Sequence, residues 1–143
     1  MKIKELAHRD LATIDPECTL LEAARKMRAY DVGSLPVQKS GRLVGIVTDR
    51  DLVLRGTAEG RDPRGARVRD VMSMQVLSCS DRIDVKDAMK LMLENRARRV
   101  VVVNDDHRPV GLVSLRDLAL APGGESFAGE IYAALSLQTA GRH

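Results

Sequence analysis

The chain has 143 residues, of which 30% are charged and 44% are hydrophobic, and its formal net charge is +3. A chain of this length buries one good core, so we expect one compact unit rather than two separate domains of about 70 residues. No apolar run approaches the roughly 18 to 20 residues of a membrane span, and residues 1–5 open directly into charged sequence without a signal-peptide core. We therefore expect a cytoplasmic protein without a membrane partner.

Cysteine and histidine form no recognisable metal or catalytic pattern. Cys18 and Cys79 are the only cysteines and neither belongs to a CxxC pair, so we interpret both as small buried thiols rather than as a disulfide or metal site. The three histidines, His8, His107 and His143, are scattered along the chain. Because no nucleophile with a partner base stands out, the sequence predicts neither an enzyme nor a catalytic cofactor.

The first half predicts a helix, two strands and a second helix. Thr19 precedes an apolar stripe with helical spacing, and Glu22 follows three residues later as in a capping box, so a helix is expected over 19–30. Met27 on this stripe is expected in the core. Strands are expected over 34–38 and 43–47, joined by a turn at Ser40–Gly41. The second helix starts after Thr48 and ends near Arg55–Gly56.

Five arginines crowd the segment between the halves, and residues 56–65 within this segment are interpreted as the connector. A nucleic-acid binder would use such a cluster for phosphates, and a single-strand binder would add stacking aromatics, but the chain has one Phe, two Tyr and no Trp. Nucleic acid is therefore not the expected partner. We interpret the cluster as a solvated linker face that also reaches a small anionic ligand; its members are Arg55, Arg61, Arg64, Arg67 and Arg69.

The second half predicts the same elements in the same order. Asp84 caps a helix whose stripe includes Met92, and strands follow over 99–103 and 110–113 around a turn at 104–106. Residues 100–103 are valines without polar alternation, so this strand should be covered on both faces. Another helix starts after Ser114 and ends near 121–123. A terminal helix capped by Ser126 has no counterpart in the first half, and the tail after Thr139 is expected to fray.

An internal repeat explains why the halves agree. Residues 43–52 return as residues 109–118 at a spacing of 66, and upstream the match holds at 65, so that residues 3–6 fall on residues 68–71. A repeat of this kind determines how the fold is assembled. We divide the chain into a first repeat over 1–57, a linker over 58–67, a second repeat over 68–121, and a C-terminal helix and tail over 122–143.

The fold class expected from this order is α/β (α+β), with two pseudo-twofold-related β-α-β-β-α repeats and packed sheets. The predicted helices of one half cover too little of the two apolar faces of its sheet, and packing the two sheets together would solve this. Helices left exposed at the edges would pair with a second copy, so a homodimer is expected.

Both repeats end in a hydroxyl followed three residues later by an aspartate. Thr48 and Asp51 form this pair in the first repeat, and Ser114 and Asp117 form it in the second. One interpretation is a helix capping box that only satisfies unpaired backbone amides. The other is nucleotide recognition, in which the helix N-terminus and hydroxyl face a phosphate and the carboxylate accepts from ribose hydroxyls.

The ordered set of motifs resembles a tandem pair of CBS domains, a Bateman module, in a stand-alone CBS-domain protein. The resemblance covers about 120 of the 143 residues. It rests on residues 3–6 and 68–72 before the repeats, residues 32–37 and 98–102 in the sheets, and the closing residues 45–52 and 111–118.

The resemblance implies a regulatory module that binds an adenine nucleotide, such as AMP, ADP, ATP or NAD, or binds S-adenosylmethionine, in clefts between the repeats. It would report energy or redox state to a downstream protein that the sequence does not identify. Asp51 and Asp117 would hold ribose hydroxyls, and Thr48 and Ser114 would touch ribose or phosphate. Phosphate cations would be Arg50, Arg98, Arg99 and Arg116, and the adenine would be edged by Ser34, Leu35, Pro36, Arg99, Val100 and Val101, with Thr13, Ile14, Ser78 and Cys79.

The repeats depart from each other in ways that bear on selectivity. Val101 stands where the first repeat has Pro36, and Arg98–Arg99 aligns with Gly33–Ser34, so the second pocket should be better supplied with positive charge. Members of this family with empty pockets also exist. The alternative function is therefore a protein-interaction module with vestigial pockets, whose C-terminal helix carries the contact.

Overall fold

The structure is a computed structural model, and it describes residues 1–7 and 10–140. It divides the chain into two compact units, where the length alone suggested one. The repeat-1 unit comprises Asp10–Val76 and Asp105–Pro109, and the repeat-2 unit comprises Met1–Arg9, Leu77–Asn104 and Val110–His143. Among the described residues, no helix has both the length and the apolar character needed to cross a membrane.

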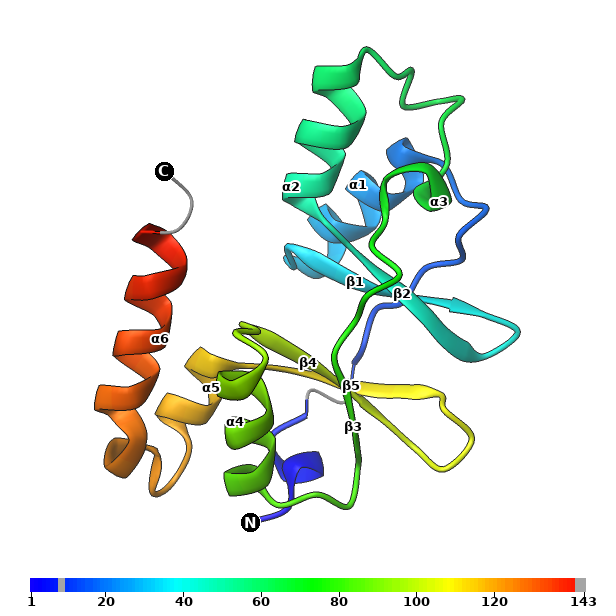
Figure 1. Cartoon of the computed structure of the whole chain (residues 1–143). Coiled ribbons are helices and arrows are strands. Elements are labelled where there is room, and N and C mark those ends of the chain that lie inside the picture. The colour runs from blue at the N-terminus through cyan, green and yellow to red at the C-terminus, as the bar shows by residue number, and fades with distance from the viewer. Residues whose placement is uncertain (8–9, 141–143) are drawn as a thin grey trace. The chain divides into compact units, whose positions relative to one another are not determined.

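The repeat-1 unit is built on an antiparallel hairpin. Strands β1 (Ser34–Lys39) and β2 (Arg42–Thr48) pair so that Ser34 lies opposite Thr48 at one end and Lys39 lies opposite Arg42 at the other. Figure 1 shows the helical segments of this unit on one side of the hairpin. They are α1 (Leu20–Tyr30), α2 (Asp49–Asp51), the π-helical segment Leu52–Gly56, the 3-10 turn Thr57–Glu59, and α3 (Val68–Val71).

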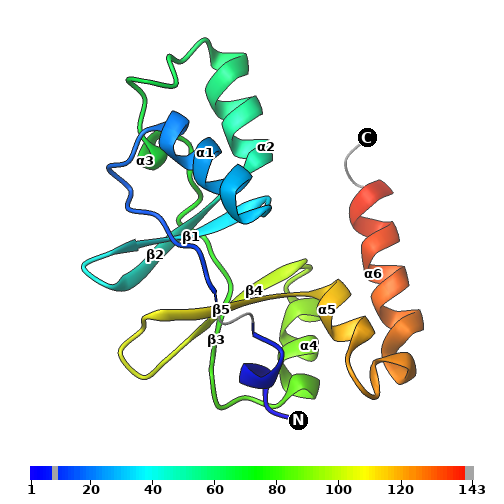
Figure 2. The same cartoon turned by 180° about the vertical axis from the view of Figure 1, so that it is seen from behind.

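The repeat-2 unit repeats this plan around a sheet of order β3-β4-β5. Strand β3 (Ser78–Ser80) runs parallel to β4 (Arg99–Val103), with Ser78 opposite Val101, and β5 (Pro109–Ser114) lies on the other side of β4. The view from behind in Figure 2 shows α4, α5 and α6 together on one flank of this unit. The helical elements are the 3-10 turn Ile3–Glu5, α4 (Val85–Glu94), α5 (Leu115–Leu120), the 3-10 turn Gly124–Phe127, and α6 (Ala128–Ala140).

Each unit has its own hydrophobic core, and the expected core residues are in it. Met27 is 6% exposed and Met92 is fully buried, which confirms that both methionines are packing residues. The valines of β4 are buried as their unbroken apolar run predicts. The chain therefore satisfies the α/β class expected from its alternating helices and strands.

Of the three predicted helix caps, Thr19 is confirmed, whereas Asp84 and Ser126 are wrong. Thr19 Oγ1 accepts a hydrogen bond from the Glu22 amide at 3.1 Å, as predicted. Asp84 occupies the cap position of α4, but its side chain makes no capping bond and instead lies 3.4 Å from the Lys2 ammonium. Ser126 does not cap α6, because it lies inside the preceding 3-10 turn, where its hydroxyl donates to the Gly123 carbonyl.

The helical stretch after Thr48 is longer and less regular than predicted. It continues as a π-helical segment and then a 3-10 turn to Glu59, three residues beyond the predicted end at Gly56. Gly56 is buried, and a Cβ atom there would lie 2.9 Å from Leu20 Cδ1. The irregular turn thus coincides with close packing of this segment against α1. The expected fraying after Thr139 falls mainly on 141–143, outside the described residues.

Each unit is completed by the segment that leads into the other repeat. Ile3 is fully buried in the core of the repeat-2 unit, where its amide donates to the Ile83 carbonyl at 2.9 Å. Val68 and Val71, which lead into the second repeat, are buried in the core of the repeat-1 unit. The repeats of the sequence therefore do not coincide with the compact units of the structure, because the first residues of each repeat pack in the unit of the other. We call these the exchanged segments.

Candidate functional site

The first candidate site lies where β2 ends and α2 begins, and we call it the first corner: Gly33, Ser34, Thr48, Asp49, Arg50 and Asp51. The Asp51 amide donates to Thr48 Oγ1 at 3.1 Å, and the Thr48 amide donates to Asp51 Oδ2 at 2.9 Å. The capping box is therefore real. It occupies one carboxylate oxygen, and no described residue donates to the other, Oδ1. The half-buried Asp51 thus keeps an acceptor for a ligand hydroxyl.

The second corner repeats this geometry where β5 meets α5, and comprises Arg98, Arg99, Ser114, Leu115, Arg116 and Asp117. The Asp117 amide donates to Ser114 Oγ at 3.1 Å, and the Ser114 amide donates to Asp117 Oδ2 at 2.8 Å. Two capping boxes that agree within about 0.1 Å place the same hydroxyl and carboxylate at the same strand-to-helix junction of both repeats.

The residue before β1 and the residue before β4 each accept a backbone hydrogen bond from the start of the helix that follows the hairpin. The Asp49 amide donates to the Gly33 carbonyl at 2.9 Å, and the Leu115 amide donates to the Arg98 carbonyl at 3.0 Å. A Cβ atom on Gly33 would lie 3.1 Å from Asp49 Oδ2, so this carboxylate sits directly over the glycine. Leu115 is instead buried in the core and is 1% exposed. The two corners share the same backbone hydrogen bonds but carry different charged side chains.

The residues expected to edge an adenine are sheet residues in both units. Ser34, Leu35 and Pro36 are buried in β1, and the Pro36 carbonyl accepts from the Ile14 amide at 3.0 Å. In β4, Val100 and Val101 are fully buried, and the Val101 amide donates to the Leu77 carbonyl at 2.9 Å. The backbone groups at Pro36 and Val101 are therefore engaged in the sheet, while Arg99 is exposed at the start of β4.

Thr13–Ile14 lies beside β1, and Ser78–Cys79 lies in β3 beside β4. Ile14 is opposite Val37, and Cys79 is opposite Val102 at the equivalent place. Ile14 is thus three strand positions away from the Ser34–Thr48 pair of the first corner. The structure brings Thr48 and Asp51 together, whereas the Thr13 hydroxyl accepts its hydrogen bond from Gln38.

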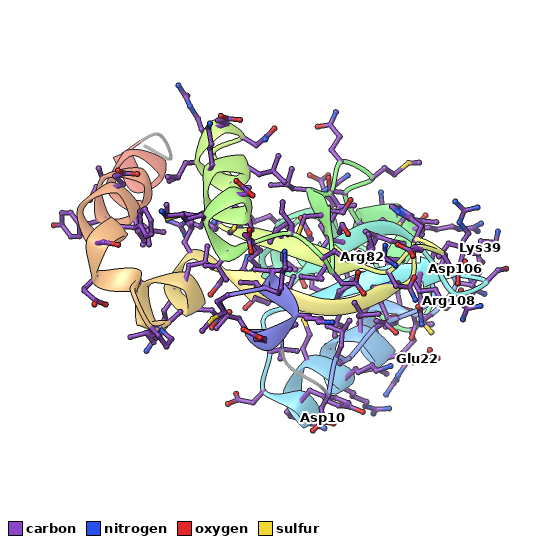
Figure 3. The ribbon with its side chains drawn as sticks, turned by 90° about the horizontal axis from the view of Figure 1, so that it is seen from below. Asp10, Glu22, Lys39, Arg82, Asp106 and Arg108 are labelled. Carbon is purple, nitrogen blue, oxygen red and sulfur yellow. The ribbon has the colours of Figure 1, made fainter. Side chains whose placement is uncertain are left out.

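A cavity that the sequence did not reveal opens beside Thr13. Its volume is about 490 Å³, and its lining includes Thr13, Cys18, Glu22, Lys26 and Gln38. Gln38 Nε2 donates to Thr13 Oγ1 at 2.8 Å, and the Lys26 ammonium donates to the Thr13 carbonyl. Figure 3 labels Glu22 on α1, Lys39 at the end of β1 and Arg108 in the loop before β5. No local motif could have predicted the cavity, because residues far apart in sequence line it.

The linker arginines are exposed, but several of them bind the protein's own backbone. Arg55 donates to the Met72 carbonyl and Arg61 donates to the Arg55 carbonyl, each at 3.1 Å. Arg67 donates to the Glu17 carbonyl, and Arg69 Nη1 lies 3.2 Å from Glu17 Oε1. These four side chains tie the linker to its own unit, which gives them a structural role that the sequence did not predict.

Both thiols are unpaired, as predicted, although only Cys79 is buried and Cys18 is partly exposed. Burial raises the pKa of Cys79 to about 11. The pKa of Cys18 is also raised, first by burial and then by its hydrogen bond with Glu22. Both shifts favour the neutral thiol over the reactive thiolate.

A family model described as CBS domain matches residues 3–56 and 68–124, one match for each repeat. The chain belongs to the CBS-domain family. Both corners fall within the matched CBS segments, and the linker arginines Arg61, Arg64 and Arg67 fall between them.

Known proteins resemble the chain along most of its length. The CBS domain-containing protein YhcV of Bacillus subtilis is 38% identical over 136 residues, which cover 95% of this chain and 96% of that protein. The crystal structure of Hypoxic Response Protein I with two coordinated zinc ions covers 85% of this chain and 100% of that chain, with a TM-score of 0.75 and 31% identity.

A third neighbour shows the fold of a CBS domain pair with ligands. It is the CBS domain pair of protein MJ0100 in complex with 5'-methylthioadenosine and S-adenosyl-L-methionine, and it is 22% identical with a TM-score of 0.72. It covers 83% of this chain and 97% of that chain. The family model and the relative from Bacillus subtilis identify the chain as a CBS-domain pair, a regulatory type of module.

No group of three or more His, Cys, Asp or Glu side chains within residues 1–7 and 10–140 is arranged to hold a metal ion. The charged groups at the corners are carboxylates and guanidiniums, which suit a ligand with hydroxyls and phosphates.

Proposed function

We propose that the chain is a regulatory module that binds an adenine nucleotide of the AMP, ADP, ATP or NAD type and reports energy or redox state to a partner protein. The observation that carries the proposal is the doubled corner, in which a hydroxyl and a carboxylate are fixed by reciprocal hydrogen bonds at the end of a strand. A fixed carboxylate binds vicinal ribose hydroxyls without first losing side-chain freedom. The arginines at both corners support the proposal, because a guanidinium can bind phosphate oxygens.

Signalling by this module would follow from differential binding. A nucleotide shifts an equilibrium between two arrangements of the protein only if it binds one arrangement more tightly than the other. No bond needs to be made or broken. The downstream protein would recognise the favoured arrangement.

The test is calorimetric titration of the full chain with AMP, ADP, ATP and NAD. Asp51→Asn and Asp117→Asn keep a side-chain oxygen for the capping bond but remove the carboxylate charge, and Asp51→Ala and Asp117→Ala remove the group entirely. We expect weaker nucleotide binding in at least one corner variant and unchanged binding in Asp87→Ala, an exposed aspartate on α4. Unchanged affinity in both corner variants would refute the assignment of these residues.

A second candidate function is favoured by α6. Tyr132 on this helix is 74% exposed, and Leu120 at the end of α5 is 76% exposed. The chain could therefore act through protein contacts, with corners that bind no nucleotide. A thermal-shift series separates the candidates, because a ligand that binds the native state raises the unfolding temperature. No shift with any of the nucleotides at saturation would favour the interaction module.

A further inference from the structure

The cavity beside Thr13 belongs to the repeat-1 unit alone and is separate from the first corner. Its walls come from the segment before α1, the first half of α1, the end of β1 and the turn that follows β1, and neither Thr48 nor Asp51 lines it. Its volume of about 490 Å³ is within the range of roughly 300 to 1,000 Å³ that small-molecule sites occupy. A small ligand therefore has room there without touching the corner.

The cavity holds charges of both signs that do not pair with each other. Glu22 and Lys26 both line it, and they are four residues apart on α1 with the acid first, an arrangement that ordinarily forms an ion pair on a helix surface. The ion pairs of the described residues do not include this one. The Lys26 ammonium donates to the Thr13 carbonyl instead, and Glu22 shares a hydrogen bond with the Cys18 thiol. Both charges are thus left for a third group.

Other polar groups in the cavity also keep unused hydrogen-bonding capacity. Asp15 Oδ1 accepts from the Glu17 amide at 2.8 Å, and no described residue donates to Oδ2. Gln38 donates through Nε2 to Thr13 Oγ1 at 2.8 Å, and its side-chain oxygen receives no hydrogen bond from the described part of the chain. The Lys26 ammonium has three N–H donors and uses one on the Thr13 carbonyl. The cavity therefore offers acceptors to a ligand ammonium and donors to a ligand carboxylate.

The second repeat shows that the fold does not require this polar lining. At the spacing of 65 that relates the first parts of the repeats, Lys26 corresponds to Leu91 and Gln38 corresponds to Val103. Leu91 packs against the core of the repeat-2 unit, and Val103 is 8% exposed. The half-buried Lys26 ammonium costs solvation free energy that an apolar residue at this position avoids, and a bound counter-charge would offset that cost.

We propose that this cavity binds a small zwitterion of the α-amino acid class, with the ligand ammonium facing Asp15 and Glu22 and the ligand carboxylate facing Lys26. A simple anion would be repelled by the two carboxylates, and a simple amine would leave the Lys26 ammonium without a counter-charge. A zwitterion gives groups of both signs an opposite partner. This site is additional to the nucleotide site, because the cavity does not include the corner residues Thr48 and Asp51.

The experiment titrates the full chain by calorimetry with each standard L-amino acid. The amino acid that binds most tightly is then compared with its carboxamide, which lacks the carboxylate, and with its N-acetyl derivative, which lacks the ammonium. Glu22→Gln removes the charge but keeps an oxygen for the Cys18 thiol. Its matched control is Asp87→Asn, at the equivalent exposed position of α4.

A second variant gives the cavity the residues of the second repeat. Lys26→Leu/Gln38→Val replaces the ammonium and the amide by the apolar side chains that occupy these positions in the repeat-2 unit. Its control is Lys90→Leu, which removes an exposed ammonium from α4. Thermal unfolding without ligand checks that each variant folds. Glu22→Gln changes only an exposed side chain, so it tests the site even if the double variant does not fold.

We expect Glu22→Gln and Lys26→Leu/Gln38→Val each to weaken amino acid binding by about tenfold or more. The two control variants should change the affinity by less than about twofold, because exposed charges distant from the ligand are screened by salt. The carboxamide and the N-acetyl derivative should each bind at least about tenfold more weakly than the amino acid, since each leaves one charged side of the cavity unpaired.

Three results overturn the inference. The first is that no amino acid binds the unsubstituted chain at millimolar concentration. The second is that either derivative binds as tightly as the amino acid, which would make the cavity a site for a simple amine or a simple anion. The third is an affinity that Glu22→Gln leaves unchanged, which would place the ligand elsewhere. None of these results affects the nucleotide proposal, whose test depends on Asp51 and Asp117.

Discussion

Thr48 and Ser114 each end a strand and cap the helix that follows. Their hydroxyls accept from the amides of Asp51 and Asp117 at 3.1 Å. Replacing Thr48 by Ala should lower the free energy of unfolding by about 1 kcal/mol, and Ser114→Ala should do the same, because an amide at the helix start loses its acceptor. Urea unfolding measures the loss. Thr48→Ser keeps the hydroxyl and should stay close to the unsubstituted chain; an equal loss in Thr48→Ser would show that the methyl group, not the cap, stabilises the corner.

Cys79 gives the stability a pH dependence above neutrality. Burial raises the pKa of its thiol from 9.0 to about 11, so the unfolded state ionises at lower pH than the folded state does. Its stabilising contribution is present below pH 9.0 and is lost as the pH rises toward 11, because the unfolded chain then releases a proton that the folded chain retains. Urea unfolding across this range should show a steeper loss in the unsubstituted chain than in Cys79→Ala. Parallel pH curves would contradict the assignment.

At the scale of elements, two glycines make room for the first residues of each repeat to pack against a strand of the other repeat. A Cβ atom on Gly45 in β2 would lie 2.5 Å from the Ser73 carbonyl oxygen, and one on Gly111 in β5 would lie 2.3 Å from Ala7 Cβ. Gly45→Ala should lower the free energy of unfolding by about 2 kcal/mol, since the clash is with backbone that cannot rotate away. Gly129→Ala is the control. It meets nothing within 4 Å on α6, and it should raise helix stability by up to about 1 kcal/mol. A neutral Gly45→Ala would mean that the segment at Ser73 moves freely.

Helices and strands could be predicted where the sequence pattern is local. Contacts between segments that are far apart in the sequence could not. Thr19 and its apolar stripe predicted α1, and the valines of residues 100–103 predicted a buried strand. The corners were predictable for the same reason, because hydroxyl and aspartate are three residues apart. The exchanged segments were missed, because nothing near Gly45 indicates that Ser73 will pack on it. Asp84 was misread as a cap for a similar reason, since its partner Lys2 lies in another part of the sequence.

At the scale of the whole molecule, the exchanged segments tie each repeat to the other. The core of the repeat-2 unit uses Ile3, and the core of the repeat-1 unit uses Val68 and Val71. A chain cut in the linker would therefore separate each core from residues that are contiguous with the other repeat. This connectivity couples the two units, because each leading segment packs in one core and is continuous in the chain with the repeat that follows it.

The terminal helix gives the molecule a surface that suits a second copy of itself. Phe127 before α6, and Ile131 and Leu135 on it, pack in the core of the repeat-2 unit, whereas Tyr132 on the same helix is 74% exposed. The segment Ala128–Ala140 contains one acid, Glu130, and no basic residue, so two copies of the helix would meet with little charge repulsion.

We therefore predict a homodimer through α6, measured by sedimentation equilibrium over a range of concentrations. Tyr132→Glu should shift the protein to monomer, because each copy then brings a new carboxylate to the contact, and like charges oppose pairing there. Tyr30→Glu is the matched control: it places the same new charge on α1, at a tyrosine that is 51% exposed, and should leave the dimer intact. A monomeric unsubstituted chain, or a Tyr132→Glu variant that still dimerises, would show that α6 is not the dimer contact.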